Sequence, residues 1–395
     1  MHHLGIMNSK HKTAIVVGAG YFGSVMAERI ANELGWKVLL LEKRNHVGGN
    51  SWSEPDSETG IEVHTYGPHI FHTSHEQVWN YVNRFATFNG YRHTVWATRN
   101  GKVYPLPFGL AAINLLLNRR LSPTDARKWV ETEAAKAGIS TPRNLEEKAL
   151  SLIGRPLYEA FVKEYTEKHW GMQAAELPAS IITRLPVRFT YNVGYYNDLW
   201  QGIPLDGYGA LFRKMLANPQ IEVRLNSDFF AVRDSLPPCD LLVYTGPVDQ
   251  FFHFKHGRLQ WRSVRFEKVV LNTADFQGTS VMNECDGSVP YTRTHEFKHF
   301  TPDRTFEKTI VFREYSYAPQ PGDDLYYPIR TTADLAIHAK YRAEAEQHPE
   351  VLFGGRLGAY AYLDMDHAIG SALAAFAQLK ANLSAGVAPS HQATR

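Results

Sequence analysis

The chain has 395 residues, enough for about two or three domains, and its 44% hydrophobic and 21% charged residues are ordinary for a soluble globular protein. A formal net charge of +2 provides no bulk electrostatic attraction to nucleic acid. The most apolar run, residues 109–117, is shorter than the roughly 20 residues of a membrane span. Two cysteines, Cys239 and Cys285, cannot form a disulfide framework, and the polar start lacks a signal-peptide pattern. These features predict a cytoplasmic protein.

A strand, turn, helix and second strand are predicted within residues 13–42. The turn G-A-G-Y-F-G places Gly18, Gly20 and Gly23 at G-x-G-x-x-G spacing. The first glycine allows the tight turn, the second lets a pyrophosphate approach the backbone, and the third lets helix and strand pack closely. Glu42 ends the second strand, where its carboxylate is placed for a ribose hydroxyl. The unit predicts a Rossmann-like dinucleotide site at the positive end of a helix.

A second glycine pair follows this unit, in K-R-N-H-V-G-G-N. Gly48 and Gly49 beside Asn50 are similar to a feature of FAD enzymes of the amine-oxidase and glutathione-reductase type. A long cofactor needs more backbone that is free of side chains along its length. The resemblance favours FAD over NAD.

Three histidines, His69, His72 and His75, lie three residues apart. Ser74 followed by Gln77 predicts a capping box, so that a helix begins there and the first two histidines precede it. No cysteine or carboxylate pair completes a ligand set, and we expect no metal. His69 and His72 are interpreted as edging a ligand pocket, while an ordinary structural role remains open.

The middle of the chain combines a hairpin with helices. Asn100-Gly101 joins two apolar-alternating arms between residues 91 and 106, which is typical of a β-hairpin. Residues 108–185 are predicted to be helical, with caps at Ser122 and Asn144. A third helix, opened by Pro156, places aromatic residues on one face. This stripe indicates either a helix-bundle core or a mobile aromatic lid.

The second half predicts strands that return to the first unit. Residues 221–233 are β-rich, and a strand at 241–244 leads into a Thr-Gly-Pro loop of the kind that lines cofactor clefts. Residues 259–315 indicate an antiparallel sheet. V-L-F-G-G-R-L-G resembles a buried strand ending in glycines, and a long helix to about Leu383 follows.

The predicted fold class is α/β, with three domains. A Rossmann-like FAD-binding domain is expected from residues 1–90, 208–250 and 335–395. An inserted, mainly helical domain with the aromatic lid covers 91–188. An antiparallel sheet on the substrate side comprises 189–207 and 251–334.

Several longer motifs carry a family resemblance. They include V-G-A-G-Y-F-G, Y-G-P-H-I-F-H-T, E-Y-T-E-K-H-W-G-M-Q, Q-G-I-P-L-D-G-Y, V-P-Y-T-R-T-H-E, Y-Y-P-I-R and G-R-L-G-A-Y-A-Y-L-D-M-D. Across nearly its whole length the chain resembles the UDP-galactopyranose mutase family. Amine oxidases share the first motif and lack the others.

The resemblance implies where the substrate binds. Arginine side chains suit a buried diphosphate because they offer a planar fork of donors. Taken singly, each arginine could instead be an exposed ion-pair partner and each tyrosine a core residue. The implied uridine contacts are Phe161, Tyr165, Thr166 and Trp170, and the implied diphosphate contacts are Arg184, Arg293, Tyr195, Tyr327 and Tyr362. Asn283 is implied as a further polar contact to the nucleotide.

The resemblance also implies the cofactor and sugar contacts. His69 and His72 would lie by the flavin and the sugar, and His93 would contact the sugar at a position where relatives carry Asn. This difference makes His93 the point where the resemblance departs from the family pattern. The implied FAD contacts are Gly18, Gly20, Gly23, Glu42, Lys43, Gly49, Asn50, His69, Arg356, Asp364 and Met365.

The family's reaction interconverts UDP-galactopyranose and UDP-galactofuranose, for galactofuranose-containing cell-surface glycans. It uses reduced FAD, whose N5 bonds covalently to the sugar, with Arg184, Arg293 and His72 as catalytic residues. The helix that begins near Asp364 is expected to direct its positive end at the flavin N1 and O2 edge. A homodimer is expected. Two alternatives stay open: a flavin oxidase or desaturase of the amine-oxidase type, and a non-enzymatic binding protein like the guanine-dissociation inhibitors.

Overall fold

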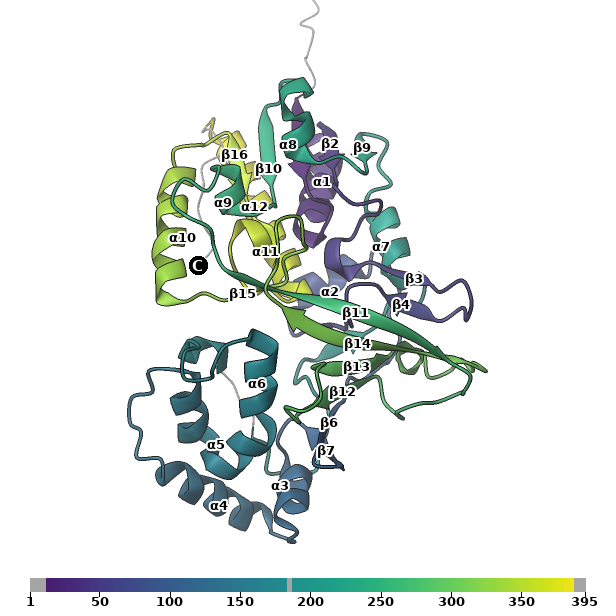
Figure 1. Cartoon of the computed structure of the whole chain (residues 1–395). Coiled ribbons are helices and arrows are strands. Elements are labelled where there is room, and N and C mark those ends of the chain that lie inside the picture. The colour runs from purple at the N-terminus through teal and green to yellow at the C-terminus, as the bar shows by residue number, and fades with distance from the viewer. Residues whose placement is uncertain (1–11, 183–186, 387–395) are drawn as a thin grey trace, which may run out of the picture.

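The structure is a computed structural model and describes residues 12–182 and 187–386. A five-stranded parallel sheet occupies one end of the molecule (Figure 1). Its strands are, in spatial order, β16 (Val351–Phe353), β10 (Leu241–Tyr244), β1 (Thr13–Val17), β2 (Lys37–Leu41) and β9 (Ile221–Arg224). All four neighbouring pairs are parallel. The chain leaves this sheet and returns to it, as the discontinuous Rossmann-like unit predicts.

Two helices from opposite ends of the chain pack together on this sheet. They are α1 (Tyr21–Leu34), which begins in the glycine turn, and α12 (Met365–Ser384). Val25, Met26 and Ile30 of α1 are fully buried in the same apolar cluster as Ile369 and Phe376 of α12. Burial of this apolar surface holds the C-terminal helix beside the dinucleotide unit.

A second, seven-stranded sheet crosses the middle of the molecule (Figure 1). It runs β15 (Tyr327–Pro328), β11 (Trp261–Leu271), β14 (Thr309–Tyr317), β13 (Arg293–Glu296), β12 (Val281–Glu284), β6 (Val95–Arg99) and β7 (Lys102–Leu106). The antiparallel sheet predicted for residues 259–315 is confirmed.

The hairpin β6–β7 is confirmed, with positive φ at Asn100 (50°) and Gly101 (71°). It extends the large sheet, because β6 pairs in parallel with β12. The sequence prediction had grouped residues 91–106 with the helices, and this part of the domain boundary is corrected. Pairing between distant strands is not encoded in the local pattern.

The helical region consists of α3 (Leu110–Leu117), α4 (Pro123–Ala135), α5 (Leu145–Phe161) and α6 (Lys163–Trp170). The caps are confirmed, since the side chains of Ser122 and Asn144 accept hydrogen bonds from backbone N–H groups three residues later. The third predicted helix is divided at Val162, between α5 and α6, although Val162 itself keeps a right-handed helical conformation. Tyr158 and Phe161 before the break lie in the bundle core.

Smaller elements connect the two sheets, and two local predictions on them are wrong. Ser74 does not cap the next helix: His75 occupies the N-cap position, and the Ser74 hydroxyl donates to Asp198. The β-rich prediction for 221–233 ends early, since Asp228 caps a short helix. The remaining strands and α-helices are β3 (Ser53–Pro55), β4 (Glu62–His64), β5 (Phe71–Thr73), α2 (Glu76–Val82), β8 (Trp200–Gly202), α7 (Gly207–Met215), α8 (Phe229–Val232), α9 (Val248–Phe251), α10 (Thr332–Ala345) and α11 (Gly355–Gly358).

Within the described ranges, no helix combines the length and the apolar character that crossing a membrane requires.

Candidate active site

One large cavity of about 1280 Å³ extends from the glycine turn to the seven-stranded sheet. Such a volume exceeds that of most small-molecule pockets and suits a dinucleotide together with a second ligand. The predicted site residues that line it are Gly18, Gly20, Gly23, Glu42, Lys43, Gly49, Asn50, His69, His72, His93, Tyr165, Tyr195, Asn283, Arg293, Tyr327, Arg356, Tyr362, Asp364 and Met365.

The glycine turn has the geometry that its spacing predicts. Gly18 has a φ of +95°, and a Cβ on Gly23 would lie 1.9 Å from the Gly18 carbonyl oxygen. A Cβ on Gly20 would meet no described atom within 4 Å, so the space beside this backbone is open toward the cavity. Gly20 is also the N-cap of α1 and supplies no side-chain acceptor to its first N–H groups. These N–H groups are therefore available to an anion.

The Glu42 side chain stabilises the glycine turn by hydrogen bonds to the backbone. Its two carboxylate oxygens accept hydrogen bonds from the backbone N–H groups of Ala19 and Arg44, both at 2.9 Å. Lys43 and Arg44 pair with Asp324 at 3.2 and 2.8 Å. This links the loop after β2 to the loop before β15. The predicted ribose contact of Glu42 remains a prediction.

Arg356 lines the cavity as a half-buried cation without an anionic partner among the described residues. Its guanidinium donates to the carbonyl oxygens of Leu325, at 2.7 Å, and Tyr326, and forms no ion pair with any described carboxylate. Burial lowers the pKa of Arg356 to about 10. Tyr21 also lines the cavity, and its buried hydroxyl has no partner within the described residues. An uncompensated charge in this position fits an anionic ligand such as a dinucleotide.

At the other end, Arg293 projects from β13 into the cavity. Its Nε donates to the Tyr165 hydroxyl at 2.7 Å and lies 3.7 Å from the Glu314 carboxylate. His295 and Thr292 each contact Glu314 at 3.0 Å. Burial alone would raise the pKa of Glu314, yet Arg293 and His295 hold it well below its usual range. The ionised carboxylate orients the arginine from behind.

Tyrosines form the wall around Arg293. Tyr195 is 41% exposed and Tyr362 is 63% exposed, and both line the cavity. This exposure excludes core packing, which the sequence had left open for Tyr195. Tyr327 stacks against Tyr362 with ring centroids 6.0 Å apart. Asn283 on β12 is the register partner of Arg293 on β13.

Two cavity histidines are neutral. Burial lowers the pKa of His69 to about 4 and that of His93 to about 3. His69 donates from Nδ1 to the Gly67 carbonyl at 2.8 Å, so its Nε2 is unprotonated. His93 is only 4% exposed and contacts the Tyr91 hydroxyl at 3.1 Å. The third cavity histidine, His72, is hydrogen-bonded through Nδ1 to the Asp198 carboxylate at 2.7 Å.

Among the described residues, three predicted substrate residues are absent from the cavity lining: Phe161, Thr166 and Trp170. Phe161 packs against Tyr104 and Phe108 in the helical core, and Thr166 is 8% exposed. Trp170 lies outside the lining, with its ring 6.4 Å from that of Tyr327. Arg184 lies outside the described residues.

The end of α6 is attached to the large sheet. The His169 carbonyl accepts hydrogen bonds from Arg262, at 3.2 Å, and from Ser316. Phe161, at the end of α5, lies in the helical core, whereas Tyr165 on α6 lines the cavity.

Sequence reasoning missed Arg44, Tyr66, Tyr196, Glu314 and Asp324, which also line the cavity. The sequence around Glu314 does not mark it as a site residue. Its role in orienting Arg293 depends on the strand register, which places the two residues opposite each other. The aromatic run at 189–200 was the available signal for Tyr196.

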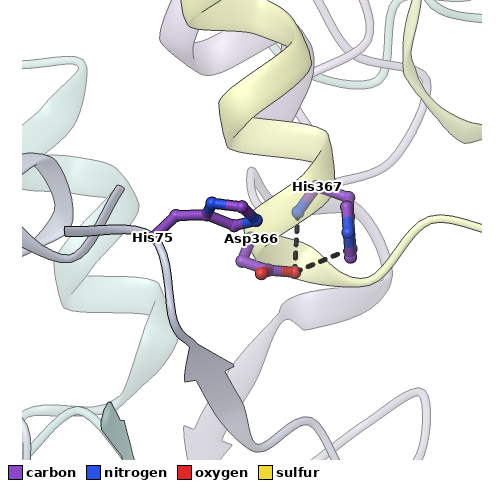
Figure 2. A group of neighbouring side chains, drawn as sticks. All are labelled: His75, Asp366 and His367. Atoms are coloured by element: carbon purple, nitrogen blue, oxygen red, sulfur yellow. Dashed lines mark hydrogen bonds and ion pairs between the residues drawn. The ribbon is translucent and has the colours of Figure 1, made fainter. Parts of the chain in front are cut away.

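His75, Asp366 and His367 form a group with metal-ligand atoms within 4.8 Å of one another (Figure 2). Asp366 already accepts a hydrogen bond from the His367 backbone N–H at 2.7 Å and pairs with its Nδ1 at 3.0 Å. Asp366 and His367 lie in the first turn of α12, whose positive end disfavours a cation. His75, the N-cap residue of α2, faces His367 with ring centroids 6.2 Å apart.

Comparison with known proteins places this architecture in a family. Residues 160–362 match the model of UDP-galactopyranose mutase, and residues 16–85 match an NAD(P)-binding Rossmann-like domain. The chain is 43% identical to a probable UDP-galactopyranose mutase of Klebsiella pneumoniae, covering 92% of this chain and 93% of the relative. It is 40% identical to a dTDP-fucopyranose mutase of Escherichia coli, covering 91% and 96%.

A crystal structure of reduced UDP-galactopyranose mutase shares the fold, with a TM-score of 0.73, 17% identity, and coverage of 94% of this chain and 96% of the other. The sequence identity to the curated relatives extends over both sheets and the helices between them. The chain belongs to the UDP-galactopyranose mutase family.

Proposed function

We propose that the protein interconverts UDP-galactopyranose and UDP-galactofuranose and requires reduced FAD. The observation that carries this proposal is a single cavity with a dinucleotide turn at one end and the Arg293–Tyr165 pair at the other. A flavin held by the turn would extend toward the arginine. The sugar between them would contact both.

Each end of the cavity has a distinct task in this proposal. Gly20 and Arg356 would bind the pyrophosphate of FAD, and Asp364 and Met365 would approach the flavin from the N-terminus of α12. When bound and reduced, FAD supplies the electron-rich N5 that bonds to the anomeric carbon of the sugar. The positive end of α12 would favour the anionic reduced flavin.

The substrate residues would hold and release UDP. Arg293, kept charged by Glu314, stabilises the diphosphate as it leaves the sugar, with Tyr195, Tyr327 and Tyr362 offering hydroxyl donors. Arg184 is proposed as a second cation. Trp170 and Thr166 would reach the uridine only after movement of α6, and Phe161 only after movement of the end of α5. Closure of these helices over the cavity would also limit water access.

The test is chromatography of UDP-galactopyranose after incubation with oxidised and with dithionite-reduced protein. We expect an isomeric UDP-sugar only with the reduced protein. Its absence from both incubations would overturn the proposal. Oxygen consumption with an oxidised product would indicate the amine-oxidase type of enzyme, and a colourless purified protein would indicate the non-enzymatic alternative.

A second candidate substrate is dTDP-fucopyranose, since a relative with 40% identity carries that name. The same assay with both sugar nucleotides compares them directly. We favour the UDP-sugar because the matching family model is that of the UDP-galactopyranose mutase. A larger kcat/KM for dTDP-fucopyranose would reverse this assignment.

We further propose a cytoplasmic homodimer serving galactofuranose-containing glycan synthesis. Light scattering on the purified chain would measure its oligomeric mass. A monomer at micromolar concentration would contradict the dimer.

A further inference from the structure

His72 lines the cavity and is hydrogen-bonded to Asp198, although 126 residues separate the two in the chain. His72 lies on β5, which pairs antiparallel with β8 just after Asp198, in the register His72↔Gln201. His72 Nδ1 is 2.7 Å from Asp198 Oδ2. The other carboxylate oxygen accepts from the Ser74 hydroxyl at 2.7 Å, and this hydroxyl accepts from the Leu199 N–H at 3.3 Å. Both oxygens of the carboxylate are therefore fixed.

This geometry determines the tautomer of His72. Burial alone would raise the pKa of Asp198, but the hydrogen bonds from Ser74 and His72 lower it. An ionised carboxylate only accepts hydrogen bonds, so the proton must reside on His72 Nδ1. Nε2 then carries no proton and is free to accept a hydrogen bond from a ligand in the cavity, since no described group forms a hydrogen bond to it.

The ring plane is fixed as well. The imidazole of His72 stacks on Tyr196, with ring centroids 3.6 Å apart and an interplanar angle of 15°. The titratable groups around it are Asp198, Asp364 and His93, and His93 is buried and neutral. A proton taken up by Nε2 would therefore be balanced by the Asp198 carboxylate.

The proposed reaction needs such a proton carrier. When a six-membered sugar ring becomes five-membered, the bond between C1 and the ring oxygen breaks, and that oxygen gains a proton. The C4 hydroxyl loses a proton as its oxygen bonds to C1. One bond is exchanged for another and one proton moves, without net gain or loss of electrons. A fixed, unprotonated imidazole nitrogen suits both transfers.

We propose that Asp198 is a positioning residue that holds His72 with its proton on Nδ1, so that Nε2 carries this proton between the two sugar oxygens. The inference rests on the proposed function. Ser74 supports it by orienting the carboxylate.

The first test is Asp198→Asn, which keeps the shape and offers an N–H group to Nδ1. We expect the proton of His72 to move to Nε2, and kcat to fall about 100-fold with KM and flavin content unchanged. ¹⁵N NMR of histidine-labelled protein reports the tautomer directly, and the His72 signals are assigned by their loss in His72→Ala. The matched control is Asp234→Asn, since that carboxylate is 97% exposed, and we expect it to match wild type.

A double-mutant cycle tests whether Asp198 acts through His72. Asp198→Asn should cause no further loss of turnover in the His72→Ala background. An equal loss in both backgrounds, or an unchanged tautomer, would overturn the inference. If Asp198→Asn fails to fold, Ser74→Ala keeps the carboxylate and should give a smaller fall in kcat, with wild-type rates overturning the inference.

The two proposals fail separately. If reduced wild-type protein leaves UDP-galactopyranose unchanged, the proposed function is wrong. If wild type is active and Asp198→Asn is equally active, only the role of Asp198 is wrong.

Discussion

The dinucleotide end of the cavity is formed by the backbone of one continuous stretch, whereas the sugar-nucleotide end is formed by side chains from distant elements. Gly18, Gly20 and Gly23 lie within six residues of sequence. Tyr165, Arg293 and Tyr362 come from a helix, a strand and a loop that meet only in the folded chain.

This difference predicts two kinds of sensitivity. A backbone site is damaged by adding atoms, because the space is needed for the ligand or for helix packing. A side-chain site is damaged by removing charge, because the buried diphosphate then lacks a counter-ion. The following variants separate these cases.

The largest effect is expected for Arg293→Ala. Removing this cation should lower turnover at least ~10³-fold while FAD stays bound, since the glycine turn is untouched. Turnover of reduced protein and the flavin absorbance per protein measure the two quantities. Near-normal turnover would remove Arg293 from the site.

Two further variants test whether lost turnover in Arg293→Ala reflects a folding defect. Arg293→Ala leaves the buried Glu314 unpaired, whereas Arg293→Lys keeps its counter-charge but loses the guanidinium fork. Arg313→Lys, on the neighbouring strand β14 and paired with the exposed Glu267, is the matched control and should be unaffected.

Two substitutions in the glycine turn distinguish the space that a ligand would occupy from the space that helix packing requires. Gly23→Ala should destabilise the protein by about 1–3 kcal/mol, because its Cβ would overlap the Gly18 carbonyl. Gly20→Ala should leave the flavin-free protein as stable as wild type, yet reduce flavin content strongly, because its Cβ would occupy only the open space of the cavity.

Thermal melts of flavin-free protein and the ratio of flavin to protein absorbance distinguish these variants. Gly90→Ala, where the structure places no described atom within 4 Å of the added carbon, is the control. Full flavin content in Gly20→Ala would show that the pyrophosphate does not pass beside this residue.

A smaller effect is expected for His93→Asn. His93 is neutral, since burial lowers its pKa to about 3, so the change removes no charge. An asparagine amide can replace its contact with the Tyr91 hydroxyl. Losing part of one hydrogen bond should change kcat/KM by about fivefold at most. A loss of about 100-fold would assign His93 a direct role in the chemistry.

The smallest effect is expected from breaking the ion pair between Asp56 and Lys268. Asp56 lies in the turn between β3 and β4, and Lys268 lies on β11 of the seven-stranded sheet. Burial alone would raise the pKa of Asp56, but Lys268 and Thr59 hold it at about 2. Its stabilisation is therefore present above the ordinary value of 3.8 and is lost as the pH falls through about 2.

Asp56→Asn should accordingly lower Tm by about 2 °C at pH 7, and the difference from wild type should shrink below pH 4. Melts of both proteins across this range measure it. A difference that stays constant with pH would show that packing, not charge, is responsible.

The sequence by itself determined the elements whose signals are local. The glycine turn, the hairpin at Asn100-Gly101, and the caps at Ser122 and Asn144 depend on the φ preferences or hydrogen bonds of neighbouring residues. Most of the site residues that the motifs implied line the cavity.

Only the tertiary structure decided which side chains meet. The pairing of β6 with β12 moved the hairpin into the large sheet, packing against Tyr104 and Phe108 placed Phe161 in the helical core, and the pairing of β5 with β8 placed Asp198 on His72. The same pairing took Ser74 away from its predicted cap. The physical reason is that strand register and burial depend on contacts between distant residues, which no local pattern contains.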